Sequence, residues 1–213
     1  LKPAALYRMN VINSRDMKSV LEKTHKPAIH YAEEKFWVDS SNALPWIVEP
    51  LYEIFPNARF IHLIRDGRKV VSSFYNKFSD VVYDDRCVSV VNEWLEKPCT
   101  MPEPPPEKKY WRPFPVKGES FYDEFKNFSR FQRLCYYWQD LNMSIRNSLI
   151  DIPDRQKMFV RLEDLTSDTV VLKNFLGMFD TEINDDFIEM LKKPVNVAVP
   201  KNFPLSQEQI KEF

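Results

Sequence analysis

Residues 60–74 read FIHLIRDGRKVVSSF, and no other stretch says more about how this chain folds. Residues 60–64 are apolar apart from His62 and predict a short buried strand. Gly67 then permits a tight turn, and the residues after it predict a helix that carries Ser73. Arg65 therefore lies where a strand hands over to a helix, which is where open α/β sheets bind their ligands.

The residue types at this junction favour an anionic ligand. A guanidinium can bind two phosphate oxygens, and a hydroxyl on the helix can donate a further hydrogen bond. The first backbone N–H groups of a helix are also suited to phosphate. The alternative is a surface ion pair at Arg65 and a solvated serine at position 73. Because Gly67 is one of only three glycines and directly follows an apolar strand, we favour a phosphate site made by Arg65 and Ser73.

Composition and charge exclude several classes of protein. The 213 residues include 30 Lys and Arg against 31 Asp and Glu, so the net charge of −1 gives no overall field for nucleic acid or an anionic membrane. We therefore expect no nucleic-acid partner. Basic residues gather only locally, beside the predicted phosphate site: Arg65, Arg68, Lys69 and Lys77.

Cysteine usage and hydropathy bear on the compartment. The three cysteines, Cys87, Cys99 and Cys135, have no metal-binding spacing and are an odd number, which is typical of reduced buried thiols. No apolar run reaches the length of a membrane span, and the start does not resemble a signal peptide. These features favour a cytoplasmic location. Because Leu1 is not a natural initiator, we expect the chain to be part of a longer protein.

Alternating strand and helix patterns predict an α/β fold with a parallel sheet. We expect strands at residues 35–39, 59–64 and 157–162. Helices are expected near the N-terminus with Ser14 or Asp16 as a cap, and at 43–55, 67–78, 128–150, 163–179, 185–192 and from 206. Residues 98–115 hold seven of the sixteen prolines and predict a long loop, either a functional lid or a disordered segment. Its aromatic residues, Trp111 and Phe114, are candidates to line an acceptor cleft.

The spacing of Arg65, Gly67 and Ser73 resembles the 3′-phosphate-binding signature of sulfotransferases that use 3′-phosphoadenosine 5′-phosphosulfate. The longer run from FPNARF at residues 55–60 to Ser73 resembles the protein-tyrosine sulfotransferases and their bacterial relatives. The resemblance implies that Arg65 and Ser73 hold the 3′-phosphate of this cofactor. Lys77 stands where the tyrosine sulfotransferases carry a further arginine, so it keeps the charge but not the planar fork.

Two later segments add to the resemblance. KPVNV at residues 193–197, followed by Lys201, is similar to a C-terminal segment whose lysine reaches the cofactor phosphates, which implies that role for Lys201. RLEDL at 161–165 and FLG at 175–177 resemble a strand-and-helix element of the same family. Many relatives have a tyrosine at the position of Leu162, and leucine cannot make its hydroxyl contact with adenine.

The chain also departs from the family. The glycine-rich loop that binds the 5′-phosphosulfate has no counterpart here, because no glycine precedes Gly67. Residues 40–42 are Ser-Ser-Asn where relatives carry a lysine or Lys-Thr-His, and these residues are neither cationic nor basic at neutral pH. Asp39 is the nearest candidate base, although a strand-end or capping role is the alternative. The tripeptide Lys-Thr-His at residues 23–25 follows no predicted strand, so we interpret it as coincidence.

The resemblance implies a single sulfotransferase-like domain over residues 1–213 that lacks its N-terminal strand and phosphosulfate loop. Its fold would be a three-layer α/β sandwich around a short parallel sheet, similar to the P-loop kinase-like core. Its activity would be sulfuryl transfer from 3′-phosphoadenosine 5′-phosphosulfate to an acceptor hydroxyl or amine, releasing adenosine 3′,5′-bisphosphate, with no metal. A non-catalytic nucleotide-binding module is the alternative. A nucleotide kinase would need a GxxxxGK[ST] loop, which the sequence lacks.

Overall fold

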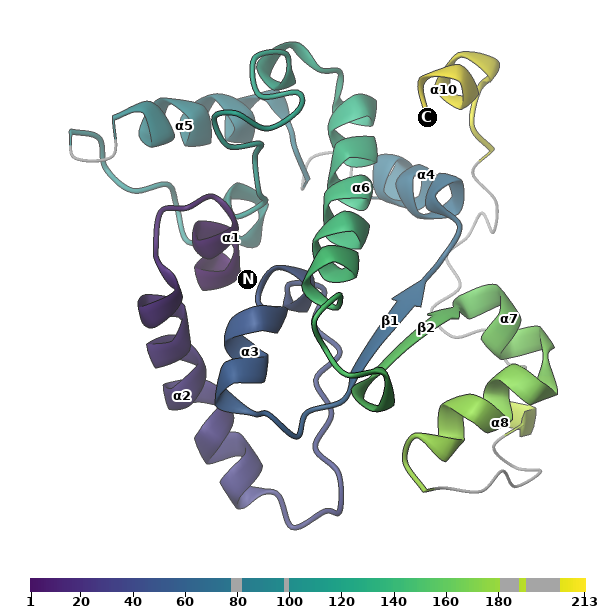
Figure 1. Cartoon of the computed structure of the whole chain (residues 1–213). Coiled ribbons are helices and arrows are strands. Elements are labelled where there is room, and N and C mark those ends of the chain that lie inside the picture. The colour runs from purple at the N-terminus through teal and green to yellow at the C-terminus, as the bar shows by residue number, and fades with distance from the viewer. Residues whose placement is uncertain (78–81, 98–99, 181–187, 191–203) are drawn as a thin grey trace.

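The computed structural model describes residues 1–77, 82–97, 100–180, 188–190 and 204–213. Figure 1 shows many helices around one small sheet. The α-helices are α1 (Lys2–Arg8), α2 (Ser14–Tyr31), α3 (Val48–Ile54), α4 (Gly67–Lys77), α5 (Asp85–Glu96), α6 (Arg130–Ser148), α7 (Leu162–Ser167), α8 (Thr169–Gly177) and α10 (Gln207–Glu212). Short 3₁₀ turns are η1 (Leu44–Trp46), η2 (Lys108–Tyr110), η3 (Phe125–Asn127) and η4 (Asp154–Gln156).

The sheet consists of two parallel strands, β1 (Phe60–Ile64) and β2 (Lys157–Arg161), in the described part of the chain. Their register runs from Phe60 opposite Lys157 to Ile64 opposite Arg161, so both strands end at the same edge. The predicted strands at 59–64 and 157–162, and their parallel pairing, are confirmed.

The strand predicted at residues 35–39 is wrong. This segment is irregular, and the side chains of Phe36, Trp37 and Val38 are exposed rather than buried in a sheet. The ring of Phe36 packs on Phe179, with centroids 5.7 Å apart, and the ring of Trp37 packs on His25 at 5.4 Å. Contacts with rings of α2 and of the turn after α8 therefore account for an apolar run that resembles a strand in sequence.

Helices pack on both faces of the sheet (Figure 1). On one face Phe60 packs with Ile145 and Leu149 at the end of α6. On the other face Val160 packs with apolar side chains of α7 and α8, among them Leu165. The predicted helices at 67–78, 128–150 and 163–179 are observed as α4, α6 and the pair α7 and α8, where Asp168 caps α8 through the N–H groups of Val170 and Val171. Most of the predicted helix at 185–192 lies outside the described residues.

Two predicted helices begin differently from the sequence interpretation. The cap of α2 is Asn13 rather than Ser14, and Asn13 and Asp16 form a reciprocal capping box. The expected helix at 43–55 is divided into η1 and α3 at Ile47. Proline has no N–H to donate to the carbonyl four residues earlier, and the division places Pro50 in the first turn of α3, where that donor is not needed.

The largest apolar core lies beside the sheet, among α1, α2, α5 and α6. The proline-rich loop contributes to it, because Trp111 and Phe114 are buried, at 1% and 3% exposure. Trp111 packs against Trp94 of α5 with ring centroids 5.9 Å apart, and its indole N–H donates to the Pro105 carbonyl at 2.9 Å. The expectation that Trp111 and Phe114 line an acceptor cleft is therefore wrong, since both rings stabilise the core.

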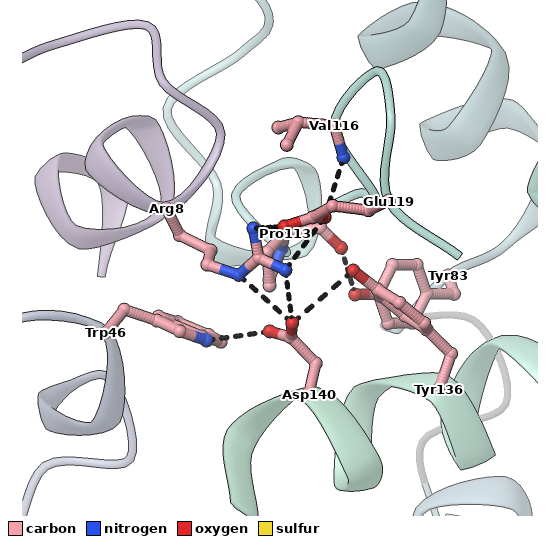
Figure 2. A network of polar contacts seen from close by, with 8 residues as sticks. All are labelled: Arg8, Trp46, Tyr83, Pro113, Val116, Glu119, Tyr136 and Asp140. Atoms are coloured by element: carbon pink, nitrogen blue, oxygen red, sulfur yellow. Dashed lines mark hydrogen bonds and ion pairs between the residues drawn. The ribbon is translucent and has the colours of Figure 1, made fainter. Parts of the chain in front are cut away.

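A buried carboxylate joins three parts of this core (Figure 2). Asp140 of α6 accepts hydrogen bonds from Nε of Arg8 in α1 at 3.0 Å and from the indole N–H of Trp46 in η1 at 2.8 Å. The Arg8 guanidinium also binds Glu119 at 2.9 Å. Burial disfavours its charged form, but the hydrogen bonds with Asp140 and Glu119 outweigh burial and raise the pKa of Arg8. One ionised cluster therefore fixes α1 and η1 against α6.

Candidate functional site

The predicted phosphate site lies at the carboxyl edge of the sheet, where β1 leads into α4 (Figure 1). Arg65 follows the last residue of β1 directly, and its side chain is exposed. Among the described residues, neither an ion pair nor a hydrogen bond occupies its guanidinium. The strand–turn–helix context predicted for Arg65 is therefore present.

Helix α4 carries the other two predicted residues, Ser73 and Lys77, at different positions along its axis. Ser73 is half-buried in the middle of α4, and Lys77 is exposed in its last turn. Eleven residues of helix span about 16 Å, so the backbone of Lys77 lies at the far end of α4 from Arg65. Ser73 therefore lies between Arg65 and Lys77 along the axis of α4.

The start of α4 is capped from within the chain. The Asp66 carboxylate accepts the backbone N–H of Arg68 at 2.9 Å and pairs with the Arg68 guanidinium at 3.1 Å. The hydrogen bond from the Arg68 side chain holds the pKa of Asp66 below its usual value. The expectation that this helix start offers its N–H groups to phosphate is therefore wrong for Arg68, whose N–H group already has an anionic acceptor.

Two aromatic side chains of the protein approach the backbone of Gly67 closely. A β-carbon added at Gly67 would lie 2.6 Å from Cζ of Phe213 and 2.8 Å from Cε2 of Trp138. These two rings also contact each other, with centroids 5.9 Å apart. Glycine is needed at position 67 because aromatic side chains of α6 and of the segment after α10 pack on its backbone.

Glu163 links the two strand ends. It lies in the first turn of α7, just after β2, and its Oε1 accepts the backbone N–H of Asp66 at 3.1 Å. This hydrogen bond lowers the pKa of Glu163, and the charges of Arg161 and Lys69 act in the same direction. The residue after Arg65 is thus held by a carboxylate that follows the neighbouring strand.

Asp39, the candidate base, is paired with His25 of α2. Its Oδ2 lies 3.2 Å from Nε2 of His25, and Nδ1 of His25 lies 2.9 Å from Oγ1 of Thr24. The other Asp39 oxygen accepts the N–H of Ser41 at 2.8 Å. His25 of the Lys-Thr-His tripeptide therefore contacts Asp39 directly, and Thr24 contacts it through His25. The sequence interpretation missed this pairing because the segment between α2 and Asp39 has no regular pattern.

Other predicted features have different outcomes. Lys201 and residues 193–197 lie outside the described residues. Leu162 begins α7 and is half-buried. A hollow of about 400 Å³ lies at the opposite end of the strands, beside Arg59 and Arg155, and is not part of the predicted site. The ammonium of Lys157 at its edge is already bound by the carbonyls of Leu149 and Ile150.

Comparison with known proteins gives one positive result. A family model described as "Sulfotransferase family" matches residues 6–97, which is less than half of the chain and includes Asp39, Arg65, Ser73 and Lys77. No curated protein and no solved structure matches the chain. Within the described residues, none of the helices combines the length and apolar character of a membrane span. The match supports a sulfotransferase family, with which the mixed fold and its small parallel sheet are consistent.

Proposed function

We propose that this chain is a sulfotransferase domain, related to the protein-tyrosine sulfotransferases, that uses 3′-phosphoadenosine 5′-phosphosulfate as its donor. The observation that carries the proposal is the exposed guanidinium of Arg65 at the end of β1, inside the segment matched to the family. A planar guanidinium suits two phosphate oxygens, and Ser73 on the following helix supplies a neutral donor. In this proposal Arg65 and Ser73 bind the 3′-phosphate without the N–H group of Arg68, which the Asp66 carboxylate already accepts.

The remaining expected residues complete the proposed site. Lys77 and Lys201 would add positive charge around the phosphates. The P-loop kinase-like, three-layer core is part of the proposal and is supported by helices on both faces of the parallel pair. Residues 1–213 would form one domain that supplies the 3′-phosphate half of the cofactor site.

When bound, the cofactor supplies a sulfuryl group that passes to an acceptor hydroxyl or amine, with adenosine 3′,5′-bisphosphate as the leaving product. The chain's contribution is mainly binding and orientation, which carry most of the rate in such group transfers. Asp39 is the candidate to accept the proton of the acceptor group. Nε2 of His25 lies 3.2 Å from Oδ2 of Asp39, and a hydrogen bond donated by this nitrogen would orient the carboxylate.

Thermal unfolding with two nucleotides tests the proposal. Adenosine 3′,5′-bisphosphate should raise the melting temperature of the protein more than an equal concentration of ATP, since a ligand of the folded state stabilises it by mass action. The R65A variant, which lacks the proposed guanidinium, should lose most of this increase. Stabilisation by ATP with no response to the bisphosphate would contradict the assignment.

A further inference from the structure

We infer that Glu163 is a positioning residue of the phosphate site, which holds the turn after β1 so that Arg65 faces the ligand. The inference rests on the proposed function and adds a residue to it. Glu163 does not touch the phosphate in this assignment. It acts through the backbone of Asp66, the residue that directly follows Arg65.

The contact joins segments that are far apart in the sequence. Asp66 follows β1, whereas Glu163 follows β2, and the last residues of the two strands, Ile64 and Arg161, lie opposite each other in the register. The turn is also fixed by β1, by the capping interaction between Asp66 and Arg68, and by the rings that pack on Gly67, and Glu163 adds a restraint from the segment after β2. Glu163 therefore restrains the turn from the end of the neighbouring strand.

The second oxygen of Glu163 argues against a purely stabilising role. Oε2 is covered from solvent and has no hydrogen-bond partner among the described residues. A covered carboxylate oxygen without a donor costs stability, and each such exception to hydrogen-bond pairing needs an explanation, of which a functional role is one. An uncharged acceptor would bind the Asp66 amide at a lower desolvation cost.

The charges around Glu163 explain why a carboxylate is placed there. Arg161 and Lys69 both lower its pKa, so each lies within electrostatic reach of the carboxyl group. Together with Arg65, they place three cationic side chains around the strand ends. The charges of Arg161 and Lys69 favour the ionised carboxylate, which is a stronger acceptor than a neutral oxygen for the N–H of Asp66, the residue after Arg65.

Substitutions at Glu163 separate the hydrogen bond from the charge. E163A removes both, whereas E163Q keeps an oxygen acceptor for the Asp66 N–H and loses the charge. D164A is the matched control, because Asp164 is exposed in the same first turn of α7 and carries the same charge. Each variant is examined by amide hydrogen exchange at Asp66 without ligand, and by calorimetric titration with adenosine 3′,5′-bisphosphate.

We expect E163A to speed exchange of the Asp66 amide and to weaken bisphosphate binding about tenfold, because the Asp66 N–H loses its hydrogen bond to a charged acceptor. E163Q should keep slow exchange and most of the affinity, and D164A should resemble the wild type. Wild-type affinity for the bisphosphate in E163A overturns the inference. It is also overturned if E163A and E163Q lose affinity equally and each loss is proportional to the variant's loss of thermal stability. If the wild-type protein itself does not bind the bisphosphate, the proposed function fails before Glu163 is at issue.

Discussion

The ring of Phe213 lies against the backbone of Gly67, so close that a β-carbon at position 67 would sit 2.6 Å from Cζ of the ring. Trp138 of α6 contacts the same glycine from a second direction. The turn between β1 and α4 is therefore packed by two aromatic side chains, next to the residue proposed to bind phosphate. This packing makes the turn a rigid support for Arg65.

Replacing Gly67 by alanine should destabilise the protein. The added methyl group would overlap Phe213 and Trp138, and overpacking of this kind costs about 1–3 kcal/mol. Urea unfolding should show this decrease in the free energy of unfolding. Gly177 at the end of α8 is the control, because a β-carbon there meets no atom within 4 Å and G177A should be neutral or mildly stabilising. Equal effects of G67A and G177A would show that the aromatic packing does not constrain position 67.

Removing the carboxylate of Asp140 should have a larger effect. D140A would leave the guanidinium of Arg8 and the indole N–H of Trp46 without their shared acceptor, and breaking a buried ion pair costs about 3–5 kcal/mol. Chemical denaturation measures this loss. E119A, which removes the more exposed partner of Arg8, should cost only about 1 kcal/mol or less. A D140A protein as stable as E119A would contradict the network in Figure 2.

Thiol reactivity gives a prediction on pH. Burial raises the pKa of both Cys87 and Cys135 to about 12, and the Asp84 carboxylate adds to the effect at Cys87. At pH 8 only about one in ten thousand of these thiols would be ionised, and the thiolate is the reactive form. In a C99S background, Ellman's reagent should react slowly with the folded protein at pH 8 and rapidly after denaturant is added. Rapid reaction of the folded protein would show that the thiols are accessible and ionised.

Local patterns predicted much of the fold. The apolar run before Arg65, the glycine turn and the 3.6-residue periodicity of α6 are properties of neighbouring residues, and each predicted its element correctly. The strand prediction for residues 35–39 was wrong because aromatic residues favour strands in sequence, whereas here ring contacts with distant residues hold this segment outside the described sheet. The prediction that Trp111 and Phe114 line a cleft was wrong because their position in a loop does not reveal whether a ring packs into the core.

In the candidate site, too, local relationships could be predicted from the sequence and contacts between distant segments could not. The spacing of Arg65 and Ser73 could be interpreted from sequence because strand and helix are consecutive. The contacts of Glu163 with Asp66 and of Phe213 with Gly67 join distant segments, and no local signal predicts such pairs. His25 and Asp39 are likewise joined across the irregular segment that follows α2.

Calorimetric titration of adenosine 3′,5′-bisphosphate into the wild type, R65A and R68A bears on the proposed site without depending on the acceptor. Arg68 is the matched control, because it lies in the same turn but its guanidinium is already paired with Asp66. A charge-assisted hydrogen bond contributes about 1.5–3 kcal/mol. R65A should therefore bind at least tenfold more weakly, while R68A stays close to the wild type. Undiminished affinity in R65A, or equal losses in R65A and R68A, would contradict the phosphate site proposed here.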